Sequence, residues 1–217
     1  EVPDRTTGRR VAARSVPCRL EPGSETVMNE TLQLGGDVKL WNEFTPNLYE
    51  VTVAFEGGGN SAERSEVFGM RSIAADGNRL LVNGTPAFMR GTLECCIFPL
   101  TGCPPTDPEG WEKVFRTAKE WGLNHLRFHS WCPPEAAFEV ADRVGMYLQV
   151  ELPVWTLNVG ADSLATAFMY EEGERMLAAY GNHPSFCFMS MGNELQPDFG
   201  VLNAMRSHFQ RLDPRRL

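Results

Sequence analysis

Four short apolar runs alternate with four helical patterns in the second part of the chain, and this alternation limits the folds open to it. The helical patterns repeat apolar residues at i, i+3, i+4 and i+7, as in Trp111, Val114, Phe115 and Ala118. Consecutive strand–helix units predict a parallel sheet with right-handed crossovers, either doubly wound or closed into a barrel. The spacing of the apolar residues is compatible with both arrangements of the sheet. The predicted strands are residues 88–93, 125–129, 146–152 and 186–192.

The first part of the chain has a different pattern. Short alternating segments, among them 26–34 and 49–55, lie between turn signals such as the glycines at 57–59. Period-two alternation of this kind predicts half-buried antiparallel strands, and therefore a β-sandwich. The turn residues at 76–78 predict a further hairpin between 68–74 and 79–82. A second tight turn at Asn83-Gly84 separates these short alternating segments from the strand–helix units that follow.

Composition excludes several classes of protein. The 217 residues are 42% hydrophobic and 22% charged, and no apolar run approaches the ~20 residues of a membrane span. A formal net charge of −8 argues against a nucleic-acid partner, whose phosphates require a basic surface. The six cysteines lack zinc-like spacing, so we expect buried or semi-buried thiols and neither a zinc site nor a disulfide framework. No signal peptide opens the chain, and we expect both ends to continue in a longer protein.

Polar residues gather where the predicted strands end. Glu94, Arg127 to His129, Glu151 and Asn193-Glu194 follow the four strands in order. The carboxyl ends of parallel strands meet at one edge, where barrel enzymes place their chemistry. A nucleotide-binding doubly wound sheet would need a glycine-rich turn after its first strand, and residues 91–95 are not one. The strand ends therefore favour a barrel.

Glu194 is the main catalytic candidate. It follows the apolar run 186–192, so its carboxylate lies where a buried strand emerges into solvent. Two interpretations of the run stay open: a catalytic carboxylate, or a Glu that caps the next helix.

Several motifs together resemble the family 2 glycoside hydrolases, which include β-galactosidases, β-glucuronidases and β-mannosidases. The likeness covers roughly residues 40–217 and rests on Trp41, Pro46-Asn47-Leu48-Tyr49, Phe68-Gly69-Met70-Arg71, Leu81-Val82-Asn83-Gly84, Arg90-Gly91, the segments 122–127 and 141–145, Asn182-His183-Pro184-Ser185 and Gly192-Asn193-Glu194. The resemblance implies an immunoglobulin-like β-sandwich over residues 1–84, incomplete at its start. It implies the first four βα units of a (β/α)₈ TIM barrel, the catalytic domain, over residues 85–217.

The same resemblance implies roles for the residues at the strand ends. Glu194 would be the general acid/base, which protonates the glycosidic oxygen and then deprotonates water. Asn193 would bond the 2-hydroxyl of the sugar, or alternatively make a local turn bond. Arg127 would lie beside the nucleophile and keep it ionised, although a structural pair with Glu151 or Glu94 is also compatible.

Three further residues are expected to line the sugar site. His129 corresponds to a substrate-contacting His of the family but is shifted by one position relative to Arg127, so a structural His is the alternative. Glu151 and Trp155 would line the sugar-binding end, Trp155 either as a stacking platform or as a core residue. His183 lies at the opposite end of its strand and is expected to be structural.

The retaining mechanism requires a second carboxylate, which the family takes from a later strand, so we expect the nucleophile outside these residues and the chain alone to be inactive. The alternatives are a non-catalytic carbohydrate-binding or scaffolding relative, and a dyad of Glu151 with Glu194. A carbohydrate is the expected partner, with no nucleic acid or membrane, and the rest of the barrel is expected from the full-length chain. No cofactor or metal is expected, and family resemblance favours a periplasmic or extracellular location.

Overall fold

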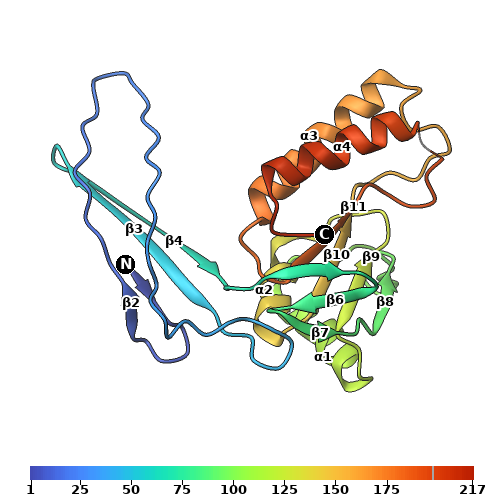
Figure 1. The fold of residues 1–217 in the computed structure, drawn as a ribbon, viewed down its shortest axis with the longest axis horizontal. Coiled ribbons are helices and arrows are strands. Elements are labelled where there is room, and N and C mark those ends of the chain that lie inside the picture. The colour runs from blue at the N-terminus through green and yellow to red at the C-terminus, as the bar shows by residue number, and fades with distance from the viewer. Residues whose placement is uncertain (197) are drawn as a thin grey trace.

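The computed structural model describes residues 1–196 and 198–217, and its second part is built on a four-stranded parallel sheet (Figure 1). The strand order is β11-β10-β9-β8, and each neighbouring pair is parallel. The strands are β8 (Gly91–Glu94), β9 (His125–Phe128), β10 (Tyr147–Glu151) and β11 (Phe186–Ser190). All four lie within or close to the ranges predicted from the apolar runs.

A helix follows each strand, as the periodicity predicts. The helices are α1 (Pro108–Glu120), α2 (Glu135–Val144), α3 (Ser163–Tyr180) and α4 (Phe199–Leu212). Three of them begin at an aspartate whose side chain accepts backbone N–H bonds of the first turn: Asp107, Asp162 and Asp198. Helix α2 ends at Gly145 in the left-handed conformation. Among the described residues, no helix is long and apolar enough to cross a membrane.

The sheet has one apolar and one polar face. Leu126, Phe128, Leu148 and Val150 are buried in the core that the helices form against the sheet. The intervening residues of the same strands carry polar groups toward the opposite face. They are His125, Arg127, Gln149 and Glu151. Period-two alternation in β9 and β10 therefore separates a packing face from a face that can carry chemistry.

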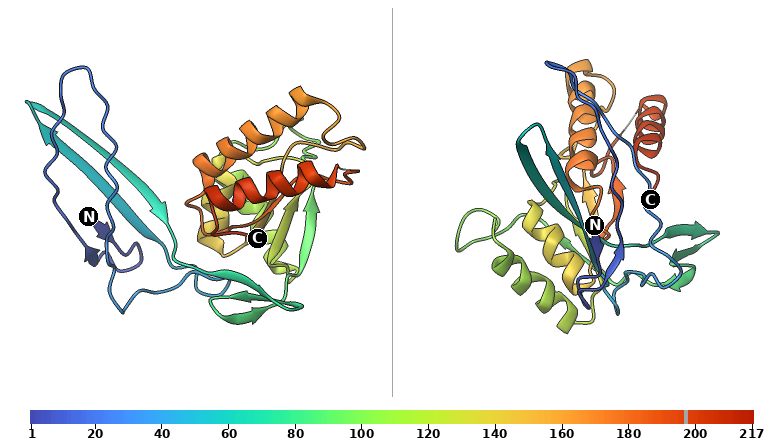
Figure 2. Two further views of the ribbon diagram at one scale, coloured as in Figure 1. Left: turned by 45° about the horizontal axis from the view of Figure 1, so that its top comes forward. Right: turned by 90° about the vertical axis from the view of Figure 1, so that its left-hand side faces the viewer.

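Helices α3 and α4 lie side by side (Figure 2). Their close approach depends on Gly173, because a Cβ there would lie 2.2 Å from the Phe209 ring. After α4 the chain returns to the sheet, where Leu217 donates to the carbonyl of Cys187 at 3.0 Å and accepts from the N–H of Met189 at 2.9 Å. These two bonds form a parallel bridge beside β11.

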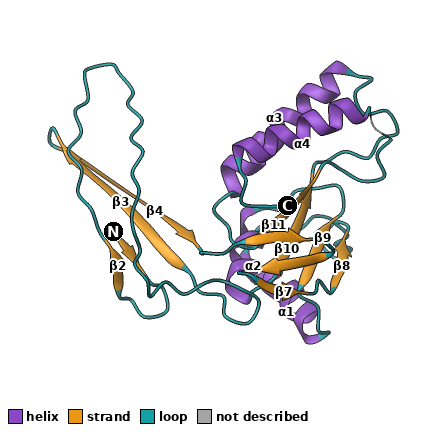
Figure 3. Cartoon of the chain, in the orientation of Figure 1, coloured by secondary structure: helices purple, strands orange, loops and turns teal. Residues whose placement is uncertain are grey.

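The first part of the chain consists of antiparallel strands, as predicted, in three small sheets. They are β1 (Val2–Pro3) with β2 (Arg10–Ala12), β3 (Tyr49–Gly57) with β4 (Asn60–Phe68), and β5 (Ile73–Asp76) with β6 (Arg79–Val82) and β7 (Thr85–Ala87). The long β3–β4 hairpin extends away from the parallel sheet, and residues 13–40 form a loop beside it (Figure 3).

Two predictions for this part differ from the structure. Residues 26–34 form no strand, and the predicted strand 68–74 is interrupted between β4 and β5. Alternating apolar and polar residues form a strand only where a neighbouring strand supplies the backbone hydrogen bonds. Residues 13–40 have no such neighbour within the described sheets. In the segment 49–55, whose alternation predicts a half-buried strand, Val53 and Phe55 are 64% and 37% exposed. A face-to-face sandwich is therefore not confirmed by these sheets.

Trp41 connects the two parts of the chain. Its side chain is completely buried with Leu48, Val82, Tyr147 and Cys187, a cluster that spans the predicted boundary at residue 84. The indole N–H donates to the backbone carbonyl of Asp142 at 2.8 Å, and its ring meets that of Tyr147 edge to face at 5.6 Å.

Arg71 and Gly69 complete this junction and give the Phe-Gly-Met-Arg motif a structural meaning. The Arg71 guanidinium donates to the carbonyls of Pro184 at 2.9 Å and Phe186 at 2.6 Å, where β11 begins. A Cβ on Gly69 would lie 2.6 Å from the Pro184 ring and 3.1 Å from Trp41. The motif therefore holds the first part against the start of β11.

We expect Gly69→Ala to destabilise the protein by about 1–3 kcal/mol, because the new methyl group has no room between Pro184 and Trp41. Chemical denaturation of the variant measures this loss. Met70→Ala is the matched control, since Met70 is the next residue and is 40% exposed. Equal stability of the two variants would contradict the tight junction.

Candidate active site

Arg127 is the centre of a hydrogen-bonded network at the carboxyl ends of the strands. Its Nε donates to Glu151 Oε1 at 2.5 Å, and its Nη2 donates to Asn193 Oδ1 at 2.8 Å. These residues come from β9, from β10 and from the segment after β11. The structure therefore brings together three predicted site residues and supports the structural pair of Arg127 with Glu151.

Glu151 differs from its predicted role. Its side chain is 0% exposed, and both carboxylate oxygens are engaged. Oε1 accepts from Arg127 and from Gln149 Nε2 at 3.3 Å, while Oε2 accepts from the Ser130 N–H at 2.8 Å. A carboxylate enclosed in this way is stabilised by its donors and is not open to a sugar, which argues against the expected direct contact.

Asn193 is fixed by its backbone as well as its side chain. Its N–H donates to the carbonyl of Val154 at 3.0 Å, in a parallel bridge between Asn193 and Trp155 that resumes the pairing of β10 with β11. Gly192 precedes it at φ 134°, where a Cβ would lie 2.5 Å from the same Val154 carbonyl oxygen. Only glycine fits this close approach.

Glu194 is exposed and has a left-handed backbone conformation, with φ 47°. Cys96 and Ser130 have the same unusual conformation, with φ 56° and 58°, two residues after β8 and β9 end. Non-glycine residues with positive φ are costly and gather at functional sites. Glu194 lies before Asp198, the residue that caps α4, so the helix-cap interpretation does not apply to it.

His129 and Trp155 lie together at the same end of the sheet. Their ring centroids are 5.4 Å apart at an interplanar angle of 85°. Trp155 is 62% exposed, so it is not the core residue of the alternative interpretation. The predicted sugar contacts of both residues stay predictions, and the exposed aromatic face of Trp155 suits it to such a role.

The end of β8 and the loop after it add Glu94 and three thiols. Burial raises the pKa of the Glu94 carboxyl, although the Cys96 N–H bonds to it and acts in the opposite direction. The expectation of buried or semi-buried thiols holds for Cys187 and Cys132, but it is wrong for Cys18, Cys95, Cys96 and Cys103, which are exposed. Within residues 1–196 and 198–217, no group of three His, Cys, Asp or Glu side chains could hold a metal ion.

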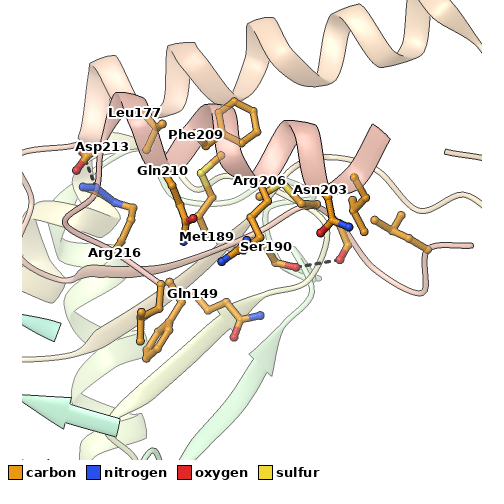
Figure 4. Close-up of a pocket in the computed structure, with 16 residues that line it drawn as sticks. Gln149, Leu177, Met189, Ser190, Asn203, Arg206, Phe209, Gln210, Asp213 and Arg216 are labelled. Carbon is orange, nitrogen blue, oxygen red and sulfur yellow. Dashed lines mark hydrogen bonds and ion pairs between the residues drawn. The ribbon is translucent and has the colours of Figure 1, made fainter. Parts of the chain in front are cut away.

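A pocket of about 550 Å³ lies beside this site, between β11 and α4 (Figure 4). Gln149, Ser190, Asn203 and Arg206 are among the residues that line it. Glu194 and Arg127 are not in its lining, so the pocket follows the edge of the sheet and meets the polar network only at Gln149 among the described residues.

Sequence reasoning missed two parts of the network, Gln149 and the Ser130 backbone. Gln149 could have been found, because residues two apart on a strand share a face and Glu151 was already a candidate. The Ser130 N–H points at Glu151 because the Ser130 backbone is left-handed. A serine in the sequence does not indicate that conformation.

Comparisons with known proteins agree with this fold. A family model described as "Glycosyl hydrolases family 2" matches residues 9–71. The β-galactosidase of Photobacterium profundum is 29% identical over 207 residues, which cover 90% of this chain and 20% of that protein. The β-galactosidase large subunit of Latilactobacillus sakei is 24% identical over 88% of this chain and 33% of its own length.

Solved structures show the same relationship in three dimensions. A family 2 member from Bacteroides cellulosilyticus superposes with a TM-score of 0.82 at 23% identity, over 99% of this chain and 29% of that one. The β-glucuronidase of Parabacteroides merdae gives a TM-score of 0.80 at 19% identity, over 99% of this chain and 28% of its own.

The fold is thus the multi-domain fold of glycoside-cleaving enzymes. The chain is a relative of the family 2 glycoside hydrolases, which confirms the resemblance seen in the sequence motifs. It spans between 16% and 33% of the length of the curated relatives that it matches.

His125 gives the sheet a measurable pH dependence. Burial, followed by the charge of Arg127, lowers the pKa of His125 to about 4, and its Nε2 is buried with no partner among the described residues. In the unfolded chain, His125 binds a proton below pH ~6.5. In the folded protein, it stays neutral until the pH falls to about 4. Stability is therefore lost as the pH falls from 6.5 to 4, by roughly 1 kcal/mol per pH unit.

We expect His125→Phe to remove this part of the acid sensitivity, because the ring can still meet Phe188, whose centroid lies 5.5 Å from that of His125. Denaturation curves at several pH values between 4 and 7 measure the difference from the original protein. His208→Phe is the control, since His208 pairs with Glu174 on the surface. A parallel pH dependence of the His125 variant and the original protein would contradict the assignment.

Proposed function

We propose that this chain is part of a retaining β-glycosidase that cleaves O-glycosidic bonds by double displacement, and that it supplies the general acid/base Glu194. The observation that carries the proposal is the position of Glu194. It follows Asn193, which Arg127 and the Val154 carbonyl hold in place at the carboxyl end of the sheet. The proposal is also supported by relatives named β-galactosidase and β-glucuronidase.

The proposed chemistry has two steps. In the first, the protonated Glu194 carboxyl gives its proton to the glycosidic oxygen while a second carboxylate attacks the anomeric carbon. In the second, the ionised Glu194 takes a proton from the water that attacks the glycosyl–enzyme bond. The exposure of Glu194 suits both steps, because leaving group and water must each reach its carboxyl group.

The nucleophile is proposed to lie outside these residues. Glu151, the partner in the dyad hypothesis, is a poor nucleophile because its oxygens are enclosed by Arg127, Gln149 and the Ser130 N–H. An attacking carboxylate needs a free lone pair directed at the sugar. We therefore prefer a carboxylate from another part of the full-length protein.

The finer architecture belongs to the same proposal. We propose that β8 to β11 are the first strands of a (β/α)₈ barrel and that residues 1–84 belong to an immunoglobulin-like domain. The parallel bridge of Leu217 beside β11 supports the barrel, because it lies where a fifth parallel strand would pair. The pocket between β11 and α4 borders the same edge.

The second candidate is a carbohydrate-binding relative without catalysis. The exposed Trp155 ring beside His129 favours it, since aromatic faces bind the apolar faces of sugars without any chemistry. Turnover of a glycoside by the full-length protein separates the two candidates, because only the glycosidase would show it. A periplasmic or extracellular location stays a prediction from family resemblance.

In the full-length protein, we expect Glu194→Gln to lower kcat for 4-nitrophenyl β-galactoside or β-glucuronide by about 10²–10⁴-fold, the usual contribution of a general acid/base. The loss is expected to be smaller for a 2,4-dinitrophenyl glycoside, whose leaving group needs less protonation. Steady-state kinetics with both leaving groups measure it.

Glu171→Gln is the matched control, because Glu171 lies on the surface of α3, where it pairs with Arg175. An equal loss in both variants, or none in Glu194→Gln, would contradict the assignment. The 217-residue chain alone is expected to give no turnover. Turnover by it that depends on Glu194 would show that a complete pair of carboxylates lies within these residues.

A further inference from the structure

We propose that Glu151 is a positioning residue that acts through Arg127 to fix the orientation of the Asn193 amide. The inference rests on the proposed function and deepens it, because it assigns Glu151 to the alignment of the sugar and not to contact with it. The bond from the Asn193 amide to the sugar 2-hydroxyl is the contact that the family resemblance already implies, and the new element is its control by Glu151.

Glu151 acts on Arg127 by fixing the plane of its guanidinium group. The carboxylate is held on one side by the Ser130 N–H and on the other by Gln149. Its Oε1 accepts from Arg127 Nε at 2.5 Å. An Nε bond fixes both the position and the tilt of the planar group, so the direction of Nη2 is fixed as well.

The direction of Nη2 decides how the Asn193 amide lies. A guanidinium group has only donors, so the atom of Asn193 that faces it at 2.8 Å must be the acceptor Oδ1. The Nδ2 group then faces away from Arg127. Arg127 thus removes one of the two orientations that the amide could adopt.

Nδ2 is left as an unpartnered donor. Asn193 is 5% exposed, and its Nδ2 is buried without a hydrogen-bond partner among the described residues. Buried donors are nearly always paired, so an unpaired one beside a catalytic candidate indicates the place of a ligand acceptor. A sugar hydroxyl oxygen is such an acceptor, and Glu194 is the next residue along the chain.

The experiment uses the full-length protein with a 4-nitrophenyl β-glycoside and its 2-deoxy analogue. We expect Glu151→Gln to lower kcat about 100-fold on the 2-hydroxy substrate, because misplaced groups lose that much. KM should change much less. On the 2-deoxy analogue, which lacks the acceptor for Nδ2, the loss should be under about 3-fold. In an Asn193→Ala background, Glu151→Gln should cause almost no further loss.

Asp142→Asn is the matched control for a purely structural effect. Asp142 is also a buried carboxylate, but it lies at the amino end of the sheet, where it pairs with His183 at 2.6 Å and accepts from the Ser185 N–H. We expect it to lower Tm while leaving the rate ratio of the two substrates unchanged. Equal losses on both substrates in Glu151→Gln, or independent losses in the double variant, would overturn the proposal.

A crystal structure of the Glu151→Gln variant separates this inference from the proposed function. We expect the Arg127–Asn193 contact to be lost. If the contact is kept at its original distance, the inference is wrong even where Glu194→Gln abolishes turnover. If the contact is lost but the original protein hydrolyses no glycoside, the proposed function is wrong and Glu151 retains only its control over the amide.

Discussion

The buried carboxylate of Glu151 is the constraint on which the site depends. An enclosed charge is stable only when every lone pair is bonded, and here the donors come from β9, from β10 and from the loop after β9. Satisfying that charge fixes Arg127, which in turn holds Asn193. Glu194 is the residue after Asn193, so the Glu151 carboxylate is connected to it through Arg127 and Asn193.

The amino end of the sheet is stabilised by hydrogen bonds between distant segments of the chain. Asn124 is fully buried, and its side chain bonds the Arg90 N–H, the Phe88 carbonyl and Glu43. Trp41 extends the same support from the first part of the chain. Bonds between distant segments make this end rigid, so the strands that carry Arg127, Glu151 and Asn193 start from a fixed base.

Local periodicity explains why the helices and the parallel strands could be predicted from sequence and some strands of the first part of the chain could not. The apolar pattern predicts a strand from residue 88, but the strand begins at Gly91. The carbonyl of Phe88 and the N–H of Arg90 bond the Asn124 side chain instead of a neighbouring strand. Residues 26–34 alternate but lack a partner among the described strands. The burial of Glu151 was also hidden, since it depends on groups from another strand and on the backbone of Ser130.

The two ends of the sheet differ in their backbone strain. The amino end has satisfied pairs such as Asp142 with His183, but it also has His125 Nε2, which is buried with no partner among the described residues. The carboxyl end has strained backbone at Ser130 and Glu194, and the Asn193 Nδ2 donor there has no partner among the described residues. Backbone strain and an unpaired donor are unfavourable in the free protein, and a ligand that accepts from this donor binds a site already shaped for it. The strained backbone thus lies at the end of the sheet where enzymes built on parallel barrels place their sites.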